Sequence, residues 1–152
     1  MIVLLQRVSR ASVSVGGRVT GECGRGFLAL FCAEKGDADA QALKLARKTA
    51  RLRVFEDEAG KMNRSVLDAG GSVLAVSQFT LAADCRSGNR PSFAGAADPE
   101  TGRRLYELYM KALADEGLAV SAGIFGAHME VSLVNDGPVT IPLRLPPDTA
   151  EA

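Results

Sequence analysis

The sequence predicts a layered α/β domain in which two sheets face each other and helices cover one of them. Short segments rich in β-branched and apolar residues recur along most of the chain, separated by glycine pairs or polar turns. Only two segments have the residue spacing of a long amphipathic helix. The length of 152 residues fits one domain with a hydrophobic core of its own.

The first part of the chain predicts a hairpin and then a buried strand. β-Branched residues and alternating apolar and polar side chains indicate a strand over residues 8–15. Gly16-Gly17 is a hairpin turn signal, so residues 18–22 are expected to return as the partner strand. After a second glycine turn, the continuous apolar run at residues 27–33 predicts a strand covered on both faces.

A helix is expected after this strand. Asp37 is a residue type that caps helix N-termini, so the helix is predicted to begin there and to run to about Arg51. The residues expected on its buried face recur at helical spacing: Ala42, Leu45, Ala46, Thr49 and Ala50.

The middle of the chain predicts short strands joined by polar loops. Residues 52–55 read as a short strand and residues 56–61 as a polar turn, while residues 63–67 have no clear pattern. Residues 72–81 are the most apolar strand prediction of this region, and they end in polar residues. Ligands collect at such strand ends when the strands point at a crevice. Residues 82–97 have the composition of a loop.

A second long helix is predicted after this loop. Asp98-Pro99-Glu100 combines an N-cap residue, a proline at the first helical position and an acid in the first turn. Gly117 is well placed to end the helix. The expected buried face consists of Leu105, Leu108, Tyr109, Ala112 and Leu113.

The C-terminal part predicts strands around a polar corner. Residues 118–121, 127–134 and 139–145 read as strands, and the turn formers Asn-Asp-Gly-Pro stand between the last two. Gly137 has no Cβ and Pro138 has no N–H, so this corner exposes bare backbone. An isolated Gly-Pro pair is most often a plain turn, but a site that recognises its ligand by main-chain atoms would use the same residues.

Composition and charge argue against several classes of protein. The 18 Lys and Arg residues balance 18 Asp and Glu residues, which disfavours a protein that coats a long stretch of nucleic acid. No apolar run is long enough to span a membrane, and the first residues lack the features of a signal peptide. Three irregularly spaced cysteines and one histidine cannot readily supply a zinc site. We therefore expect no metal and a reduced, cytoplasmic setting.

Nucleophilic side chains occur near the end of the 72–81 segment, namely Ser77, Thr80 and Cys85. A conventional catalytic triad would need His128, the only histidine, and no Gly-x-Ser-x-Gly elbow is present. A hydroxyl without a base is a weak nucleophile, so such a triad is disfavoured. The glycine-rich segment 21–26 matches no phosphate-binding loop and is better explained as a turn.

Two polar clusters remain, and both resemble segments of a known family. Ser77–Asp84, Arg90–Phe93 and Asn135–Thr140 are similar to the signature segments of the D-aminoacyl-tRNA deacylases, also called D-tyrosyl-tRNA deacylases. The opening residues Gln6–Val13 and the turn Gly60–Asn63 also resemble this family. Composition and spacing alone establish only an α/β domain of unknown function.

This resemblance implies a three-layer β/β/α domain over residues 1–145, with two facing sheets and two long helices. The tail at residues 146–152 has no counterpart, and its composition predicts disorder. The implied protein is a homodimer that hydrolyses the ester between a D-amino acid, or mischarged glycine, and the 3′ end of tRNA. No cofactor is expected, and neither DNA nor a membrane is an expected partner.

The resemblance also implies roles for three residues in chiral selection. In the family, a Gly-Pro pair with a cis peptide bond enters the partner subunit's site, where its carbonyl groups crowd side chains of L configuration. Gly137 and Pro138 match this pair, and Arg7 matches an arginine that fixes its orientation. Crowding the wrong configuration suits an enzyme that must accept many different D side chains.

The segment that holds the terminal adenosine and the reacting carbonyl is matched by Ser77, Gln78, Phe79 and Thr80. Backbone N–H groups of Phe79 and Thr80 could form an oxyanion hole, where each donor typically contributes ~3 kcal/mol. No strong base is evident, so the 2′-hydroxyl of the tRNA could take part in activating water. The sequence leaves open whether Thr80 is a nucleophile or only positions the substrate.

Two functions of other classes stay open from the residues alone. The chain could bind a small ligand or nucleotide in the same crevice without catalysis, or it could be a structural dimer without a ligand. Release of D-tyrosine from D-Tyr-tRNA separates an enzyme from a binding protein. Arg7, Arg86 and Arg90 could contact phosphates, although surface arginines are more often simply solvated.

Overall fold

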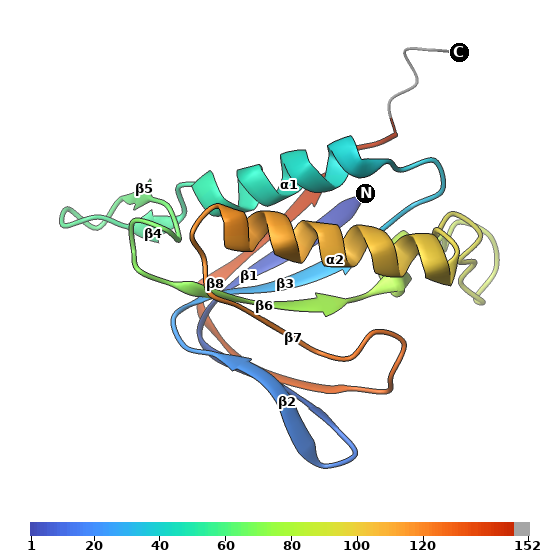
Figure 1. Ribbon diagram of the computed structural model, residues 1–152, viewed down its shortest axis with the longest axis horizontal. Coiled ribbons are helices and arrows are strands. Elements are labelled where there is room, and N and C mark those ends of the chain that lie inside the picture. The colour runs from blue at the N-terminus through green and yellow to red at the C-terminus, as the bar shows by residue number, and fades with distance from the viewer. Residues whose placement is uncertain (148–152) are drawn as a thin grey trace.

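The structure, a computed structural model, describes residues 1–147. Two helices, α1 (Asp39–Arg51) and α2 (Pro99–Asp115), lie side by side on one face of a mixed six-stranded sheet (Figure 1). This arrangement confirms the predicted α/β class with two long helices. The strands of the sheet are β1 (Ile2–Val15), β2 (Arg18–Cys23), β3 (Gly26–Cys32), β6 (Ser72–Ser77), β7 (Val120–Ala122) and β8 (Glu130–Arg144).

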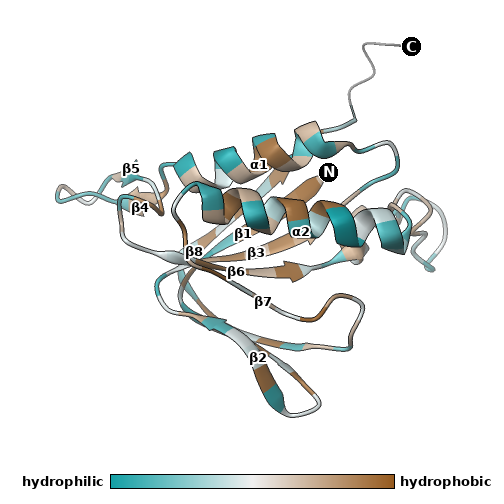
Figure 2. Ribbon diagram, in the orientation of Figure 1, coloured by the Kyte–Doolittle hydropathy of each residue, from teal (hydrophilic) through white to brown (hydrophobic). Residues whose placement is uncertain are grey.

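The central strand is β3, as its continuous apolar run predicts. It pairs antiparallel with β1 and parallel with β6, and six of its seven residues are buried. Figure 2 shows hydrophobic residues along β3 and β6, whereas the helices alternate hydrophobic and hydrophilic residues. A strand between two others, covered by helices on one face and by apolar side chains on the other, has no polar face to present to water.

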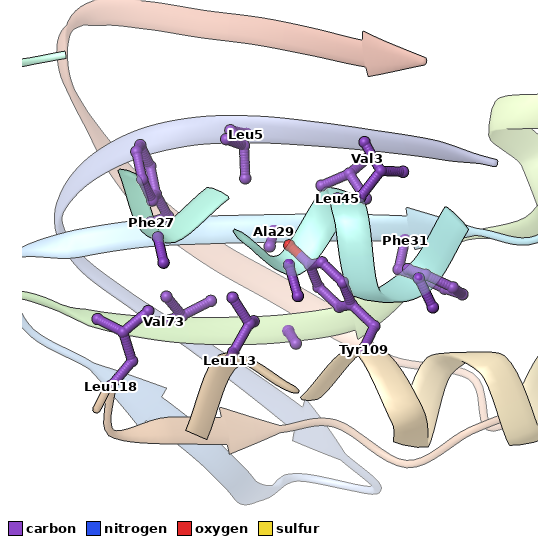
Figure 3. Close-up of a cluster of buried hydrophobic side chains, with 14 of the residues drawn as sticks. Val3, Leu5, Phe27, Ala29, Phe31, Leu45, Val73, Tyr109, Leu113 and Leu118 are labelled. Carbon is purple, nitrogen blue, oxygen red and sulfur yellow. The ribbon is translucent and has the colours of Figure 1, made fainter. Parts of the chain in front are cut away.

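The main hydrophobic core fills the space between the helices and the sheet (Figure 3). Phe31 of β3 packs against Tyr109 of α2, with ring centroids 5.2 Å apart. The hydroxyl of Tyr109 lies 2.9 Å from that of Thr49 on α1, so a buried hydrogen bond joins the two helices. The buried positions that the sequence predicts on α1 are all buried, and Tyr106 adds a buried position on α2 that it did not predict.

The end signals of α2 are confirmed. The carboxylate of Asp98 accepts a hydrogen bond from the backbone N–H of Thr101 at 3.1 Å, as an N-cap residue does. Gly117 follows the helix with a φ of 103°, the left-handed conformation that favours glycine.

The predicted start of α1 was wrong. The N-cap residue is Ala38, and its backbone N–H donates to the side chain of Gln41 at 2.8 Å. Asp37 does not cap the helix, because its carboxylate lies 2.8 Å from the amino group of Met1 and forms an ion pair there. That tertiary contact competes with the local cap.

Smaller differences occur in the middle of the chain. The strand predicted at residues 52–55 is a short hairpin formed by β4 (Phe55–Glu56) and β5 (Met62–Arg64). The strand predicted at residues 72–81 ends at Ser77, and the 3-10 turn η1 (Phe79–Ala82) follows it. The polar end of that segment is therefore a turn at the end of β6.

Hydrogen bonding joins the six strands into one sheet. The first half of β1 pairs with β3, and its second half pairs with β2. A second hydrophobic cluster lies on the face opposite the helices, where side chains of β1 pack against those of β3 and β6: Val8, Ala11, Val13, Leu28, Leu74 and Val76. Two separate facing sheets are not established by the strand pairing and stay a prediction.

The C-terminal tail is only partly described. Pro146 and Pro147 have no regular secondary structure, and the carbonyl of Pro146 accepts a hydrogen bond from the side chain of Gln41 at 3.4 Å. Residues 148–152 lie outside the described residues, so a disordered tail stays a prediction. No helix within residues 1–147 is long and apolar enough to cross a membrane.

Candidate active site

The Asn-Asp-Gly-Pro segment is a bulge within one strand, so the predicted corner between two strands was wrong. β8 runs antiparallel along β1 on both sides of this segment. Between its pairings with Gln6 and Val8, β8 passes from Thr140 to Asn135, so five residue steps oppose two. The surplus residues leave the ladder and project beside Arg7.

Arg7 holds this bulge from beneath. The residue is only 5% exposed, and its Nε donates to the carbonyl of Asp136 at 2.8 Å. Its Nη1 donates to the carbonyl of Val54 at 2.7 Å, while the guanidinium lies 6.0 Å from the ring centroid of Phe55. The guanidinium therefore links the residue before Gly137 to the segment that follows α1, as a positioning residue would.

The side chain of Asn135 braces the bulge from within. Its Oδ1 accepts from the N–H of Val139 at 2.7 Å, and its Nδ2 donates to the hydroxyl of Thr140 at 3.0 Å. Gly137 and Pro138 lie at the exposed tip, and the peptide bond between them is cis. The sequence contains Asn135 in the right segment, but its bracing role was not predicted.

The second predicted cluster lies where β6 ends. Ser77 is the last residue of β6, paired with Phe31, and the N–H of Gln78 donates to the Phe31 carbonyl at 2.7 Å. This bond fixes the start of η1. The side-chain amide of Gln78 donates to the hydroxyl of Thr80, and both Phe79 and Thr80 are exposed.

The backbone N–H groups of Phe79 and Thr80 stand at the beginning of the turn. Within residues 1–147 neither donates to a backbone carbonyl, because the first amides of a helical turn have no partner inside it. Two adjacent free donors can bind an anionic oxygen.

A cavity of about 590 Å³ opens beside this turn. Phe79 and Phe93 meet edge to face in its wall, with ring centroids 5.2 Å apart. Most of the lining is apolar, with a few polar groups among the apolar ones, which is typical of a site for a small molecule. The side chains that most define it are Ser77, Gln78, Phe79, Phe93, Asp98, Phe125, His128 and Met129.

The thiol of Cys32 in the cavity wall stays protonated, and the carboxyl of Asp84 in the following loop stays ionised. Burial raises the pKa of Cys32 to about 11, so its thiol stays protonated, and its Sγ lies 3.5 Å from the carbonyl of Phe79. The side-chain hydrogen bond from Arg86 lowers the pKa of Asp84 to about 2. Within the described part of the chain, no three His, Cys, Asp or Glu side chains gather as metal ligands.

The structure brings the predicted residues together in two groups. Gly137, Pro138 and Arg7 form one group, and Arg7 pairs with Phe27 at the first end of β3. Ser77 to Thr80 form the other group, beside Phe31 at the far end of β3. Four residue steps along β3, roughly 13 Å, separate Phe27 from Phe31. Within one subunit, the two groups are therefore apart.

Several residues of the cavity were missed by sequence reasoning. Phe93 lies in the loop before α2, whereas Phe125 and Met129 share the loop between β7 and β8, and each one alone looks like an ordinary core residue. His128 was interpreted as a structural or surface residue, and it is exposed at the cavity wall. The only local signal for this part of the cavity was the segment Phe125–Met129, in which a histidine stands close to two large apolar residues.

Known proteins match the chain over nearly its full length. The sequence model described as D-Tyr-tRNA(Tyr) deacylase matches residues 4–144. A D-aminoacyl-tRNA deacylase of Azoarcus sp. is 61% identical over 99% of each chain. A D-aminoacyl-tRNA deacylase of Ruegeria pomeroyi is 62% identical over 93% of this chain and 97% of its own.

Two solved structures match the chain in fold. A protein described as c-Myc DNA Unwinding Element Binding Protein is 41% identical, with a TM-score of 0.90, over 96% of this chain and 99% of its own. A probable eukaryotic D-amino acid tRNA deacylase shares the fold at 16% identity, with a TM-score of 0.80, over 93% of this chain and 97% of its own. The family match over residues 4–144 spans both the bulge of β8 and the turn after β6. The chain therefore belongs to the D-Tyr-tRNA(Tyr) deacylase family and is an enzyme of the ester-hydrolase class.

Proposed function

We propose that this enzyme hydrolyses the ester of D-aminoacyl-tRNA, and of mischarged glycyl-tRNA, to free amino acid and tRNA. The observation that carries the proposal is the pair of free N–H groups on Phe79 and Thr80 at the edge of an apolar cavity. That arrangement offers a place for an aromatic base next to donors for a developing oxyanion. A binding protein would need the cavity but not the donors.

The cavity is proposed to hold the adenosine at the 3′ end of the tRNA. Phe79, Phe93 and Phe125 give it aromatic walls, on which a base can stack. The ester on the ribose then lies at the turn that begins with Gln78. Recognition of the amino acid is left to the backbone, which suits a substrate whose side chain varies.

The chemistry needs little from side chains. A water oxygen attacks the ester carbonyl carbon, and the carbonyl oxygen gains negative charge that the two N–H groups stabilise by ~3 kcal/mol each. The carbon–oxygen bond to the ribose then breaks, and one proton of the water ends on the ribose oxygen. The neighbouring 2′-hydroxyl of the substrate is proposed to help this proton move, since the side-chain partner of the Thr80 hydroxyl is the amide of Gln78, which is not a base.

Thr80 is proposed to position the substrate without forming a covalent bond. Its hydroxyl accepts a hydrogen bond from the amide of Gln78, and an amide donor cannot remove the hydroxyl proton. Thr80→Ala and Thr80→Val are therefore expected to retain deacylation within about tenfold of the parent, which is far less than loss of a nucleophile costs. A loss of several thousandfold in both variants would instead assign Thr80 as the nucleophile.

Chiral selection is proposed to come from a second subunit. Gly137 and Pro138 lie at the opposite end of β3 from the cavity, so their own subunit cannot place them beside Thr80. A two-fold homodimer would bring each exposed bulge to the partner's cavity, where its carbonyl groups crowd an L side chain. The bent sheet would then provide the two facing layers of a β/β/α domain over residues 1–145.

The proposal is tested by following amino acid release from D-Tyr-tRNA, L-Tyr-tRNA and Gly-tRNA under single-turnover conditions. Rapid release from D-Tyr-tRNA and Gly-tRNA, with L-Tyr-tRNA spared, is expected. Binding of D-Tyr-tRNA without release of D-tyrosine would indicate a binding protein instead of an enzyme. Equal release from D-Tyr-tRNA and L-Tyr-tRNA would contradict chiral proofreading. We place this activity in the cytoplasm, where aminoacyl-tRNA is used.

A further inference from the structure

A basic groove runs along α1 and the residues that follow it. Its volume is about 390 Å³. Apart from Leu52, the residues lining the groove are cationic and exposed: Lys44, Arg47, Lys48, Arg51 and Arg53. The helical residues between them, such as Leu45 and Thr49, are buried against the core. The helix therefore has one face that packs, and its residues along the groove are all positive.

Most of this charge is not neutralised within the described residues. Arg51 lies 3.5 Å from Glu116 of α2, while Lys44, Arg47 and Lys48 form no salt bridge within residues 1–147. Cations in the last turn of a helix favour the helix dipole, which accounts for Lys48 and Arg51. The helix dipole does not account for Lys44 or Arg47, which lie before the last turn. In a chain with no net charge, a face of one sign needs another explanation.

The groove ends beside the bulge of β8. Arg53 is followed by Val54, whose carbonyl accepts a hydrogen bond from Arg7. The same guanidinium donates to the carbonyl of Asp136, which precedes Gly137. A single buried side chain thus connects the end of the groove to the bulge.

We propose that this groove binds the phosphate backbone of the tRNA whose 3′ end occupies the partner subunit's cavity. The inference rests on the proposed function and on the proposed entry of Gly137 and Pro138 into that cavity. If the bulge lies in the partner's site, the groove flanks the same site, and RNA leading out of it passes α1. Neighbouring cations on a helix face are about 5–6 Å apart and can contact successive phosphates.

The test compares two substrates of different size. Full D-Tyr-tRNA carries the phosphates, whereas the D-tyrosyl ester of adenosine carries the reacting group alone. The triple variant Lys44→Gln/Arg47→Gln/Lys48→Gln is expected to raise KM for D-Tyr-tRNA by about 10- to 100-fold at 0.15 M salt, and to reduce the slope of log KM against log salt by about two to three. Its turnover of the adenosine ester is expected to equal that of the parent.

Single variants supply the matched control. Arg47→Gln and Arg18→Gln remove the same charge, but Arg18 lies on β2, away from the groove. Arg47→Gln is expected to lower the salt slope by about one, and Arg18→Gln to leave it unchanged. Equal effects of Arg47→Gln and Arg18→Gln on the salt slope would show that only the overall charge of the protein matters, and would overturn the proposal.

The outcomes also separate the groove from the proposed function. A parent protein that hydrolyses neither substrate would contradict the proposed function. A parent that hydrolyses both, with a triple variant that keeps the parental KM and salt slope for D-Tyr-tRNA, would overturn the groove alone. Equal losses on tRNA and on the adenosine ester would also overturn it, since they would show damage to the cavity.

Discussion

At the scale of single residues, the candidate site depends on groups that have little or no side-chain chemistry. Phe79 and Thr80 contribute backbone N–H groups, and Gly137 and Pro138 contribute backbone carbonyl groups. Asn135 and Arg7 hold these atoms in place by hydrogen bonds. A sequence search for nucleophiles and bases would pass over such a site, because its reactive atoms are in the main chain.

Gly137 tests this reliance on backbone most directly. Its φ is +155°, and a Cβ there would lie 2.6 Å from the backbone N and 2.7 Å from Cγ2 of Val139. Gly137→Ala is therefore expected to displace the bulge and lower kcat/KM for D-Tyr-tRNA by at least tenfold, a cost of about 1.4 kcal/mol. Single-turnover deacylation of D-Tyr-tRNA and L-Tyr-tRNA measures the loss of activity and the ratio of D to L hydrolysis.

Gly24→Ala is the matched control, because a Cβ at Gly24 meets nothing within 4 Å. It is expected to keep parental activity and the parental ratio of D to L hydrolysis. Unchanged activity and an unchanged ratio in Gly137→Ala would show that the bulge has no part in selection.

At the scale of elements, local signals predicted some boundaries and tertiary contacts decided others. The cap at Asp98 and the end at Gly117 are local, so the sequence predicts them. Asp37 has equal capping chemistry, but the amino group of Met1 binds its carboxylate. A tight corner and a bulge use the same turn residues, and the difference lies in β1, which is long enough to pair on both sides of the segment.

Arg7 should be irreplaceable by lysine as the support of the bulge. Its planar fork reaches two carbonyl groups, of Val54 and Asp136, and an ammonium cannot reproduce both bonds in that geometry. Arg7→Lys is expected to lower the free energy of unfolding by about 1–3 kcal/mol, since a buried carbonyl loses its partner, and to lower activity on D-Tyr-tRNA. Urea unfolding and deacylation measure the two effects, with the exposed Arg18→Lys as the control. Parental values of both in Arg7→Lys would contradict this role.

The packing of α2 on the sheet predicts a dependence on alkaline pH. The hydroxyl of Tyr106 donates to the carbonyl of Ala75 on β6 at 2.6 Å, and burial raises its pKa from 10.0 to about 12. A group with a raised pKa contributes stability that is complete below its unfolded pKa and is lost as pH rises through its folded pKa. Stability is therefore expected to fall between pH 10 and 12, by up to about 1.4 kcal/mol per pH unit for this one proton.

Tyr106→Phe is expected to make the free energy of unfolding less dependent on pH in this window. Tyr109, whose pKa burial also raises, still contributes to the remaining slope. Urea unfolding at several pH values measures the difference between the two proteins. Identical slopes for parent and variant would show that Tyr106 ionises in the folded state as freely as in the unfolded chain.

At the scale of the whole molecule, the bulge of β8 and the turn after β6 lie beside opposite ends of β3. Their sequence segments are similar to those of one family, and the family match covers residues 4–144. What the sequence could not give is their separation, because distance along β3 depends on strand register. It also could not give the cavity wall, since Phe93 and Phe125 become neighbours only through the tertiary fold. The separation is the reason to propose that two subunits complete each site.

Subunit mixing tests that claim most directly. Gln78→Ala is expected to displace the turn that carries the two N–H donors, and Gly137→Ala to displace the bulge, so each homodimer should keep at most about a tenth of the parental activity on D-Tyr-tRNA. Co-expression at equal amounts gives heterodimers in about half of the dimers, and each heterodimer has one intact site, so about a quarter of parental activity should return. Heterodimers purified with two different affinity tags should recover about half. Heterodimers as inactive as the two homodimers would contradict a site shared between subunits.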